Sequence, residues 1–242
     1  MNRKNSNAKI KIPKLLKSKL NNKKINKIYR VFESSLNLND DFIVAVSGGP
    51  DSLALAFLAK IYSIKKNLRA EFIIVDHKLR KESTIEAKIV KKILKKFQIE
   101  SKILTWRGKK PLKNIQSLVR KKRYEILFDS CKKLNIRNIL LGHHQDDLFE
   151  NFFIRILRGS GLKGLVSLDK KIVIDNIKIL RPLLDIKKED LIFAAKHVFN
   201  YYVKDPSNID DKFQRVRVRK LLLDLENEGL DKRKFIKTIN NL

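Results

Sequence analysis

The hydrophobic and polar positions of this chain form a repeating pattern of short apolar runs and longer amphipathic stretches. Residues 40–46, DDFIVAV, contain a short β-branched run that predicts a buried strand, and residues 51–66 have the length and composition of an amphipathic helix. The pattern continues with predicted strands at residues 71–77, 101–106 and 138–144 and predicted helices at residues 83–98, 114–135 and 145–159. Strands that alternate with helices at this spacing form βαβ units, so we expect an α/β fold built on a parallel sheet.

The pattern changes after residue 165. Residues 170–184 predict a small hairpin or edge strand with a turn at Asp175 and Asn176, and further helices are expected at residues 187–197 and 212–228. Ser83 and Glu86 have the spacing of a capping box, which would start the helix at residue 83. The chain is expected to divide into a basic N-terminal arm and helix, a main domain and a basic helical extension, at residues 1–38, 39–183 and 184–242.

The segment SGGPDS, residues 47–52, connects the first predicted strand to the first long predicted helix. Its glycines can adopt backbone angles closed to other residues, which lets main-chain N–H groups approach a ligand closely. Ser47 and Ser52 add hydroxyls, Asp51 adds a carboxylate for a magnesium ion, and the helix N-terminus favours negative charge. The segment fits a phosphate or pyrophosphate, or else it is only a capped helix start. The common G-x-x-x-x-G-K-[ST] nucleotide loop does not occur in the chain.

Polar clusters also follow the second and fourth predicted strands, as DHKLR and GHHQDD. Ligands of parallel sheets lie beyond the carboxyl ends of the strands, so we expect these clusters to meet residues 47–52. On the helix from residue 145, Asp147 and Glu150 share a face and could bind an amine or a metal ion. Alternatively, the acidic residues at this helix start merely favour the helix dipole.

The composition adds a strong positive charge, with a formal net charge of +29 and a pI near 10.2. A polyanionic partner is the usual reason for such a charge. Drift in an AT-rich genome also enriches lysine, so both causes are expected to act. Residues 1–30 contain no acidic residue, which fits an organelle presequence or a basic arm that contacts RNA.

The chain contains a single cysteine, Cys131. An internal disulfide, a cysteine zinc site and an iron–sulfur cluster are therefore excluded within the chain, and a reducing compartment is indicated. No apolar stretch is long enough to span a membrane, and the N-terminus lacks the apolar core of a secretory signal. We expect a soluble protein with no membrane partner.

Taken in order, the motifs are SGGPDS, DHKLR, NIQSLVRKKRY, GHHQDDLFENFFIRILRGSGLKGL, ILRPLL, DPSN and FQRVRVR. Together they resemble the tRNA(Ile)-lysidine synthases, which are PP-loop ATP pyrophosphatases, over roughly residues 42–223. The GHH-x-DD-x-x-E and RGSG-x-x-GL block is specific to that family. The SGG-x-DS loop alone is shared with guanylate, NAD and asparagine synthetases and RNA thiolases. The resemblance implies a Rossmann-like PP-loop domain, of the adenine nucleotide alpha hydrolase-like class, with a small C-terminal helical extension.

The resemblance also implies a reaction. The family uses ATP, with Mg²⁺, to adenylate the C2 carbonyl oxygen of the wobble cytidine in isoleucine tRNA with a CAU anticodon. The ε-amine of free L-lysine then displaces AMP and gives lysidine. ATP and Mg²⁺ are therefore the expected cofactors, and this tRNA and L-lysine are the expected partners, with a homodimer left open. The expected location is the cytoplasm of a bacterium, with a mitochondrial or plastid matrix as the alternative.

Matching the motifs residue by residue implies roles for the site. The ATP-binding residues are expected to be Ser47, Gly48, Gly49, Pro50, Asp51 and Ser52, with Asp51 near magnesium. The lysine-binding and catalytic residues are expected to be Arg120, Asp147, Glu150 and His143. The lysine amine has a solution pKa near about 10.4 and must lose a proton before it attacks, for which His143 or His144 is the candidate base.

Further contacts are expected with the nucleotide and with the RNA. Asp76 and His77 are candidate nucleotide contacts. Phosphates of the tRNA are expected to be bound by Arg155, Arg158, Arg215, Arg217 and Arg219, although Arg217 could equally form a structural salt bridge.

The chain departs from the family's pattern in two respects. The family more often has DDQ-x-ET where this chain has Leu148 and Asn151 around Glu150. Many members also carry C-terminal tRNA-binding domains, which are expected to be absent here, so the selection of isoleucine tRNA over methionine tRNA is unexplained. The alternatives are another PP-loop ligase, an RNA thiolase, which usually needs a cysteine pair, or a non-catalytic basic RNA-binding protein.

Overall fold

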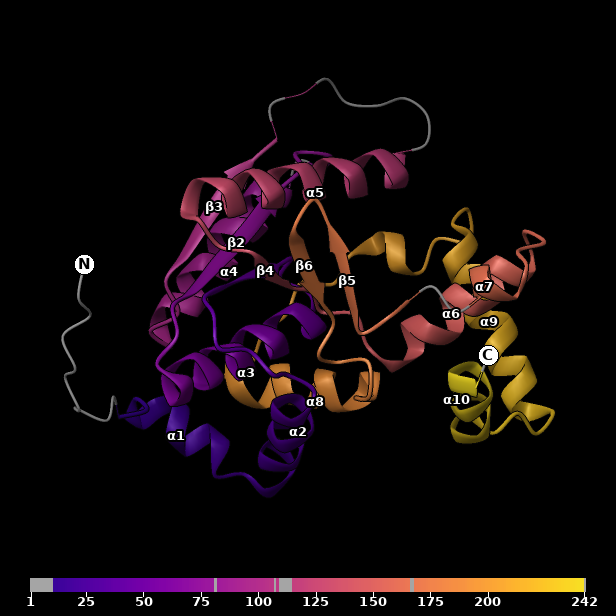
Figure 1. Ribbon diagram of the computed structural model, residues 1–242, viewed down its shortest axis with the longest axis horizontal. Helices are drawn as coiled ribbons and strands as arrows, with labels where there is room; N and C mark the ends of the chain where they lie inside the picture. The colour runs from indigo at the N-terminus through magenta and orange to yellow at the C-terminus, as the bar shows by residue number, and fades with distance from the viewer. Residues whose placement is uncertain (1–10, 81, 107, 109–114, 166–167, 242) are drawn as a thin grey trace.

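The computed structural model describes residues 11–80, 82–106, 108, 115–165 and 168–241. Six strands form one sheet in the order β3-β2-β1-β4-β6-β5 (Figure 1). The strands are β1 (Phe42–Val46), β2 (Ala70–Asp76), β3 (Ser101–Thr105), β4 (Asn138–Leu140), β5 (Lys171–Ile174) and β6 (Ile177–Leu180). Neighbouring strands are parallel, except for the antiparallel pair β5 and β6. The predicted α/β fold on a mainly parallel sheet is confirmed.

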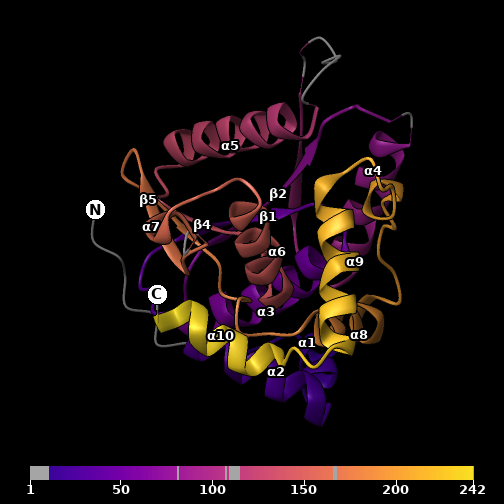
Figure 2. The same ribbon diagram turned by 90° about the vertical axis from the view of Figure 1, so that its right-hand side faces the viewer.

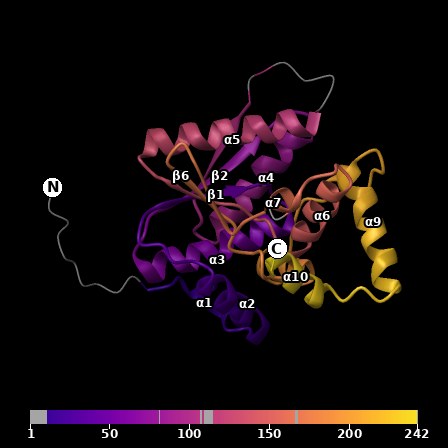
Figure 3. The same cartoon turned by 45° about the vertical axis from the view of Figure 1, so that its right-hand side comes forward.

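Most of the helices fall into three groups around this sheet. They are α1 (Lys14–Leu20), α2 (Lys23–Ser34), α3 (Pro50–Lys66), α4 (Ser83–Lys96), α5 (Ile115–Leu134), α6 (Gln145–Ile156), α7 (Leu162–Leu165), α8 (Lys188–Phe199), η1 (Pro206–Asn208), α9 (Gln214–Asn227) and α10 (Lys232–Asn241). Helix α5 covers one face and α3, α4 and α8 the other, while α6, α9 and α10 lie together beside the sheet (Figures 1, 2 and 3). None of the helices in the described residues is long and apolar enough to cross a membrane.

Alternate side chains of the central strands enter different hydrophobic clusters. Val44 of β1 packs into the cluster that contains α3, whereas Ile43 packs with Leu127 of α5 on the opposite face. This alternation follows from the two-residue period of a strand. It explains why β1 is apolar throughout, because both of its faces are covered by helices.

The N-terminal helices α1 and α2 belong to the main hydrophobic core. Leu16, Ile25 and Phe32 are fully buried in one cluster with residues of α3 and α8. One core therefore crosses both predicted domain boundaries, at residues 38 and 183, and the three-part division stays a prediction. Residues 1–10 of the predicted basic arm lie outside the described residues.

Two local predictions had different outcomes. The hairpin turn is confirmed, because Asp175 and Asn176 join β5 to β6 with φ values of 49° and 62°. The capping box at the start of α4 is wrong: Glu82 is the N-cap, and no described side chain caps the helix. Ser83 Oγ instead donates to the buried carboxylate of Asp76, at 2.8 Å, and Glu86 pairs with Arg80. The Ser83 hydroxyl donates to the buried carboxylate of Asp76 and does not cap its own helix, because an unsatisfied buried carboxylate would be costly.

The order of the strands places the crevice for a ligand. The chain builds the sheet outward from β1 in one direction through β2 and β3, and in the other through β4. Such a reversal of strand order opens a crevice at the carboxyl ends of the two strands, here β1 and β4. The segments that follow these strands are residues 47–52 and 141–147.

Candidate functional site

The turn after β1 is organised by the hydroxyl of Ser52. Its Oγ accepts hydrogen bonds from the N–H groups of Ser47 and Gly48, both at 3.1 Å. Gly49 is the N-cap of α3, and no side chain of residues 11–80 or of the other described segments caps this helix end. The N–H groups of the first turn and the helix dipole are therefore free of side-chain caps and oriented to attract an anion.

The two glycines of the turn have different roles. Gly48 has φ +86°, and a Cβ added there would lie 2.7 Å from Val90 Cγ2 and 2.9 Å from Val203 Cγ2. Gly49 has φ −68°, and an added Cβ would meet only Ser47 Oγ, at 3.8 Å. Only Gly48 needs to be glycine for both conformation and space.

This difference predicts that Gly48→Ala is much more destabilising than Gly49→Ala. We expect Gly48→Ala to lower the free energy of unfolding by about 2 kcal/mol, from positive-φ strain and the valine contacts. Gly49→Ala should cost less than about 1 kcal/mol, because it only weakens a helix cap. Urea denaturation of the two variants checks the difference, and equal losses would contradict it.

The loop after β4 packs directly against this turn. A Cβ added at Gly142 would lie 3.3 Å from the backbone of Asp51 and of Ser52. Gln145 N–H also donates to the carbonyl of Ile186, which fixes the start of α6. The polar clusters that follow β1 and β4 therefore meet, as predicted, whereas the expected meeting of DHKLR after β2 with residues 47–52 stays a prediction.

Asp51 is the acidic residue of this turn and contacts side chains from two other segments. Its Oδ2 lies 2.5 Å from Lys188 Nζ and 3.8 Å from His144 Nε2. Its Oδ1 is buried and has no hydrogen-bond partner in the part of the chain that the structure describes. Lys188 was missed by the sequence analysis, since nothing local marks a lysine 137 residues away as the partner of Asp51. A cation at the first turn of α8 opposes the helix dipole, so its contact with Asp51 offsets an unfavourable position.

His144 and Asp147 form the cap of α6. His144 N–H donates to Asp147 Oδ2 at 2.9 Å, and Asp146 N–H donates to His144 Nδ1 at 3.2 Å. Because Nδ1 accepts this bond, Nε2 is the ring nitrogen that faces Asp51 and Asp147, at 3.8 and 3.5 Å. Burial acts to raise the pKa of Asp147, but the two histidines and the His144 N–H outweigh it and lower that pKa.

The structure pairs two residues that the sequence analysis assigned to different ligands. Glu150 is 1% exposed, and its carboxylate accepts from Arg219 Nε at 2.5 Å and Nη2 at 3.2 Å. Burial raises the pKa of Glu150 even though Arg219 opposes the shift. Glu150 and Arg219 thus join α6 to α9 at the inner end of the site.

The basic side of the site comes from α5 and the segment after β6. Arg120 Nη2 donates to Tyr124 Oη at 3.3 Å. Arg181 is 4% exposed, and it donates through Nε to His143 Nδ1 at 3.3 Å. Arg123 faces Arg120, and burial first and this like charge second lower its pKa.

Asp76 and His77, the predicted nucleotide contacts, lie at the end of β2. The Asp76 carboxylate accepts from Lys78 N–H, Ser83 Oγ and Thr84 Oγ1, at 3.0, 2.8 and 2.6 Å. These bonds hold the start of α4 on the strand. Burial lowers the pKa of His77 to about 4, and its buried Nδ1 has no hydrogen-bond partner among the described residues.

The remaining predicted RNA contacts differ in exposure. Arg158 is exposed and donates to Gln214 Oε1 at 3.1 Å. Arg217 is exposed and donates to the backbone carbonyls of Asp211 and Lys212, so it holds the loop before α9. Arg155 is partly buried on α6, and Arg215 acts electrostatically on Asp147 and Glu150.

The donors suit magnesium held with a polyphosphate better than a protein-only metal cage. In the part of the chain that the structure describes, no group of three or more His, Cys, Asp or Glu residues could hold a metal ion. Mg²⁺ needs only one or two carboxylates beside substrate phosphates and waters. The unpartnered Oδ1 of Asp51, beside the uncapped helix end, fits that requirement.

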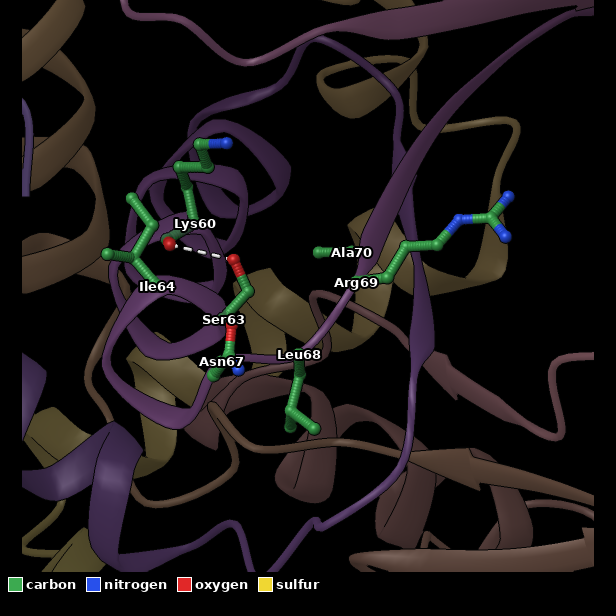
Figure 4. Close-up of a pocket in the computed structure, with 7 residues that line it drawn as sticks. All are labelled: Lys60, Ser63, Ile64, Asn67, Leu68, Arg69 and Ala70. Carbon is green, nitrogen blue, oxygen red and sulfur yellow. Dashed lines mark hydrogen bonds between the residues drawn. The ribbon is translucent and has the colours of Figure 1, made fainter. Parts of the chain in front are cut away.

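A shallow pocket lies away from these residues, where α3 ends and β2 begins (Figure 4). It is lined by Lys60, Ser63, Ile64, Asn67, Leu68, Arg69 and Ala70. This is the opposite end of α3 from the turn, so the pocket is not part of the site.

Known proteins resemble the chain in sequence and in fold. The tRNA(Ile)-lysidine synthase of Orientia tsutsugamushi is 41% identical over 184 residues, which cover 76% of this chain and 42% of that protein. The enzyme of Rhodopseudomonas palustris is 37% identical over 197 residues, covering 81% and 57%. The chain spans about half the length of the curated relatives it matches.

A solved structure shows the same fold. The U34-tRNA thiolase of Methanococcus maripaludis superposes with a TM-score of 0.74 at 20% identity, covering 90% of this chain and 80% of that one. The sequence profile of the PP-loop domain matches residues 18–226. With the glycine turn after β1 and the polar loop after β4 in contact, the chain belongs to the PP-loop family.

Proposed function

We propose that this protein joins free L-lysine to C2 of the wobble cytidine of isoleucine tRNA with a CAU anticodon, using ATP. The contact of Gly142 with the backbone of Asp51 and Ser52 carries the proposal, because it brings the GHHQDD block against the phosphate turn. Relatives named tRNA(Ile)-lysidine synthase, at 35–41% identity, support it. The single cysteine, Cys131, disfavours a thiolase that depends on a cysteine pair.

The turn at residues 47–52 would hold the ATP phosphates. First-turn N–H groups of α3 would bind phosphate oxygens, and the carboxylate of Asp51 would hold Mg²⁺. When bound, Mg²⁺ neutralises the charge that develops on the leaving pyrophosphate. The cytidine C2 oxygen then bonds to the α-phosphorus of ATP as the bond to pyrophosphate breaks.

The carboxylates at the start of α6 would receive the lysine. Asp147, whose pKa its neighbours lower, offers negative charge to an ammonium group, and Glu150, held by Arg219, lies on the same face of α6 beside it. After the ε-amine loses its proton to one of these carboxylates, its nitrogen bonds to C2 and the C2–O bond breaks, which releases AMP. We assign to Arg120, whose charge acts on His143, the stabilisation of negative charge on the departing AMP.

The RNA would approach across the basic helices. Arg155, Arg158, Arg215 and Arg217 are our proposed phosphate contacts, whereas Arg219 acts within the site through Glu150. The net charge of +29 supports a polyanionic partner. The curated relatives reported above are bacterial, which supports the bacterial cytoplasm as the location.

The proposal predicts ATP-dependent incorporation of labelled lysine into an unmodified isoleucine tRNA transcript with a CAU anticodon. An unmodified methionine tRNA transcript, which has the same anticodon, is the matched control, and each is assayed with and without ATP. Labelling of the first transcript alone is the expected result. Labelling of both transcripts would support the lysine transfer but contradict the selection of isoleucine tRNA by this chain. Labelling of neither, by folded protein that binds RNA, would overturn the proposal.

A further inference from the structure

His143 lies in a strongly basic environment just after β4. Arg120 and Arg123 act on it from α5, Arg181 from the segment after β6, and Asp147 from α6. Arg181 touches the ring directly, with Nε 3.3 Å from Nδ1. The other end of this guanidinium is anchored, because Nη1 donates to the carbonyl of Asp169 at 2.6 Å.

This contact fixes the proton on the ring. A guanidinium only donates hydrogen bonds, so Nδ1 must accept with its lone pair and carries no proton. The proton of the neutral imidazole is then on Nε2. Burial, with the three arginines adding to it and Asp147 opposing, lowers the pKa of His143 to about 3, so the ring stays neutral at physiological pH.

We propose that Arg181 is a positioning residue that holds His143 as a neutral imidazole protonated on Nε2, so that His143 donates a hydrogen bond to a substrate oxygen. The identity of that oxygen rests on the proposed function, which brings phosphate and carbonyl oxygens to this edge of the sheet. A neutral imidazole can stabilise developing negative charge in this way. The role revises the expectation that His143 removes the proton from the lysine amine, because its lone pair is already used.

The state of the ring can be measured without any substrate. The full-length chain labelled with ¹⁵N-histidine contains four histidines, and His143→Gln assigns the signals of His143. We expect protonated Nε2 and unprotonated Nδ1 that do not change between pH 5 and 8. A proton on Nδ1, or titration near pH 6.5, would overturn the proposal even if lysine transfer occurs.

Two arginine variants separate the hydrogen bond from the electrostatic field. In Arg181→Met, we expect the titration midpoint of the His143 ring to rise by more than about one pH unit. We also expect the ring to lose its preference for a proton on Nε2. Arg123→Met is the matched control, since it removes a neighbouring charge but no hydrogen bond to the ring, and it should keep the tautomer. Loss of the tautomer in both variants would overturn the role of Arg181. If Arg181→Met does not fold, the measurement on the unmodified chain decides.

Rates of lysine transfer then distinguish a hydrogen-bond donor at position 143 from a base that accepts the proton of the lysine amine. The glutamine amide can donate from about the position of Nε2 but cannot accept a proton, so His143→Gln should retain activity within about 10-fold. His143→Ala should lose about 10²-fold or more. Equal, severe losses in both folded variants would overturn the donor role. Absence of transfer by the unmodified chain would instead contradict the proposed function and leave the ring measurement to decide the tautomer.

Discussion

The Asp51→Asn variant is expected to transfer lysine about 10³-fold more slowly than the unmodified chain, which corresponds to about 4 kcal/mol of activation free energy. The reason is the loss of the carboxylate whose buried Oδ1 has no partner among the residues that the structure describes and whose Oδ2 contacts Lys188. Asparagine keeps the shape but removes the charge that would hold Mg²⁺ against the phosphates. Initial rates measured over a range of Mg²⁺ concentrations should show a higher Mg²⁺ requirement as well as a lower maximum.

Asp190→Asn is the matched control for this experiment. Asp190 is also in the first turn of a helix and also pairs with a lysine, Lys24, at 2.8 Å. It lies in α8 outside the proposed site, so its amide variant should transfer lysine within about two-fold of the unmodified rate. An Asp51→Asn variant that stays within about 10-fold would contradict the magnesium role of Asp51.

The Arg219→Met variant is expected to lose about 3 kcal/mol of unfolding free energy at pH 7, at the lower end of the range for a broken buried pair. The side chain of Glu150 is 2% exposed and would keep its charge without a partner, whereas that of Arg219 is 39% exposed, which limits the loss. Arg217→Met is the matched control. Arg217 is exposed and donates to the backbone carbonyls of Asp211 and Lys212, so its loss should cost less than about 1 kcal/mol.

The loss in Arg219→Met should also depend on pH. Burial already raises the folded-state pKa of Glu150, and Arg219 opposes that shift. Without Arg219 this pKa rises further, so the variant should lose more stability as the pH rises from about 4.5 through the new folded-state pKa. Adding Glu150→Gln should remove this dependence and recover part of the stability. Guanidinium chloride denaturation at several pH values checks both, and a loss independent of pH would contradict the assignment.

The sequence predicted the architecture because its signals are local. The β-branched runs of β1 and β2 and the Asp175–Asn176 turn each carry their own pattern, and the structure agrees. The meeting of the segments after β1 and β4 followed from the general rule for parallel sheets. The capping box at Ser83 failed because a tertiary acceptor, Asp76, competes for the same hydroxyl.

The partners within the site could not be predicted from sequence. Lys188 reaches Asp51 and Arg219 reaches Glu150 across long separations in the chain, and no periodicity encodes such pairs. Likewise, the motif identified His143 as a candidate but could not show which ring nitrogen is occupied. That depends on Arg181, which becomes its neighbour only when β6 pairs with β4.

The burial of α1 and α2 affects how this protein can be engineered for expression. Their lysines lie largely on the outer surface, but Leu16, Ile25 and Phe32 fill the core beneath α3 and α8. A truncation intended to remove the lysine-rich N-terminal segment would also remove these side chains and expose apolar surface. Replacing outward lysines such as Lys23 and Lys27 with glutamate is therefore the better way to reduce nonspecific RNA carry-over during purification.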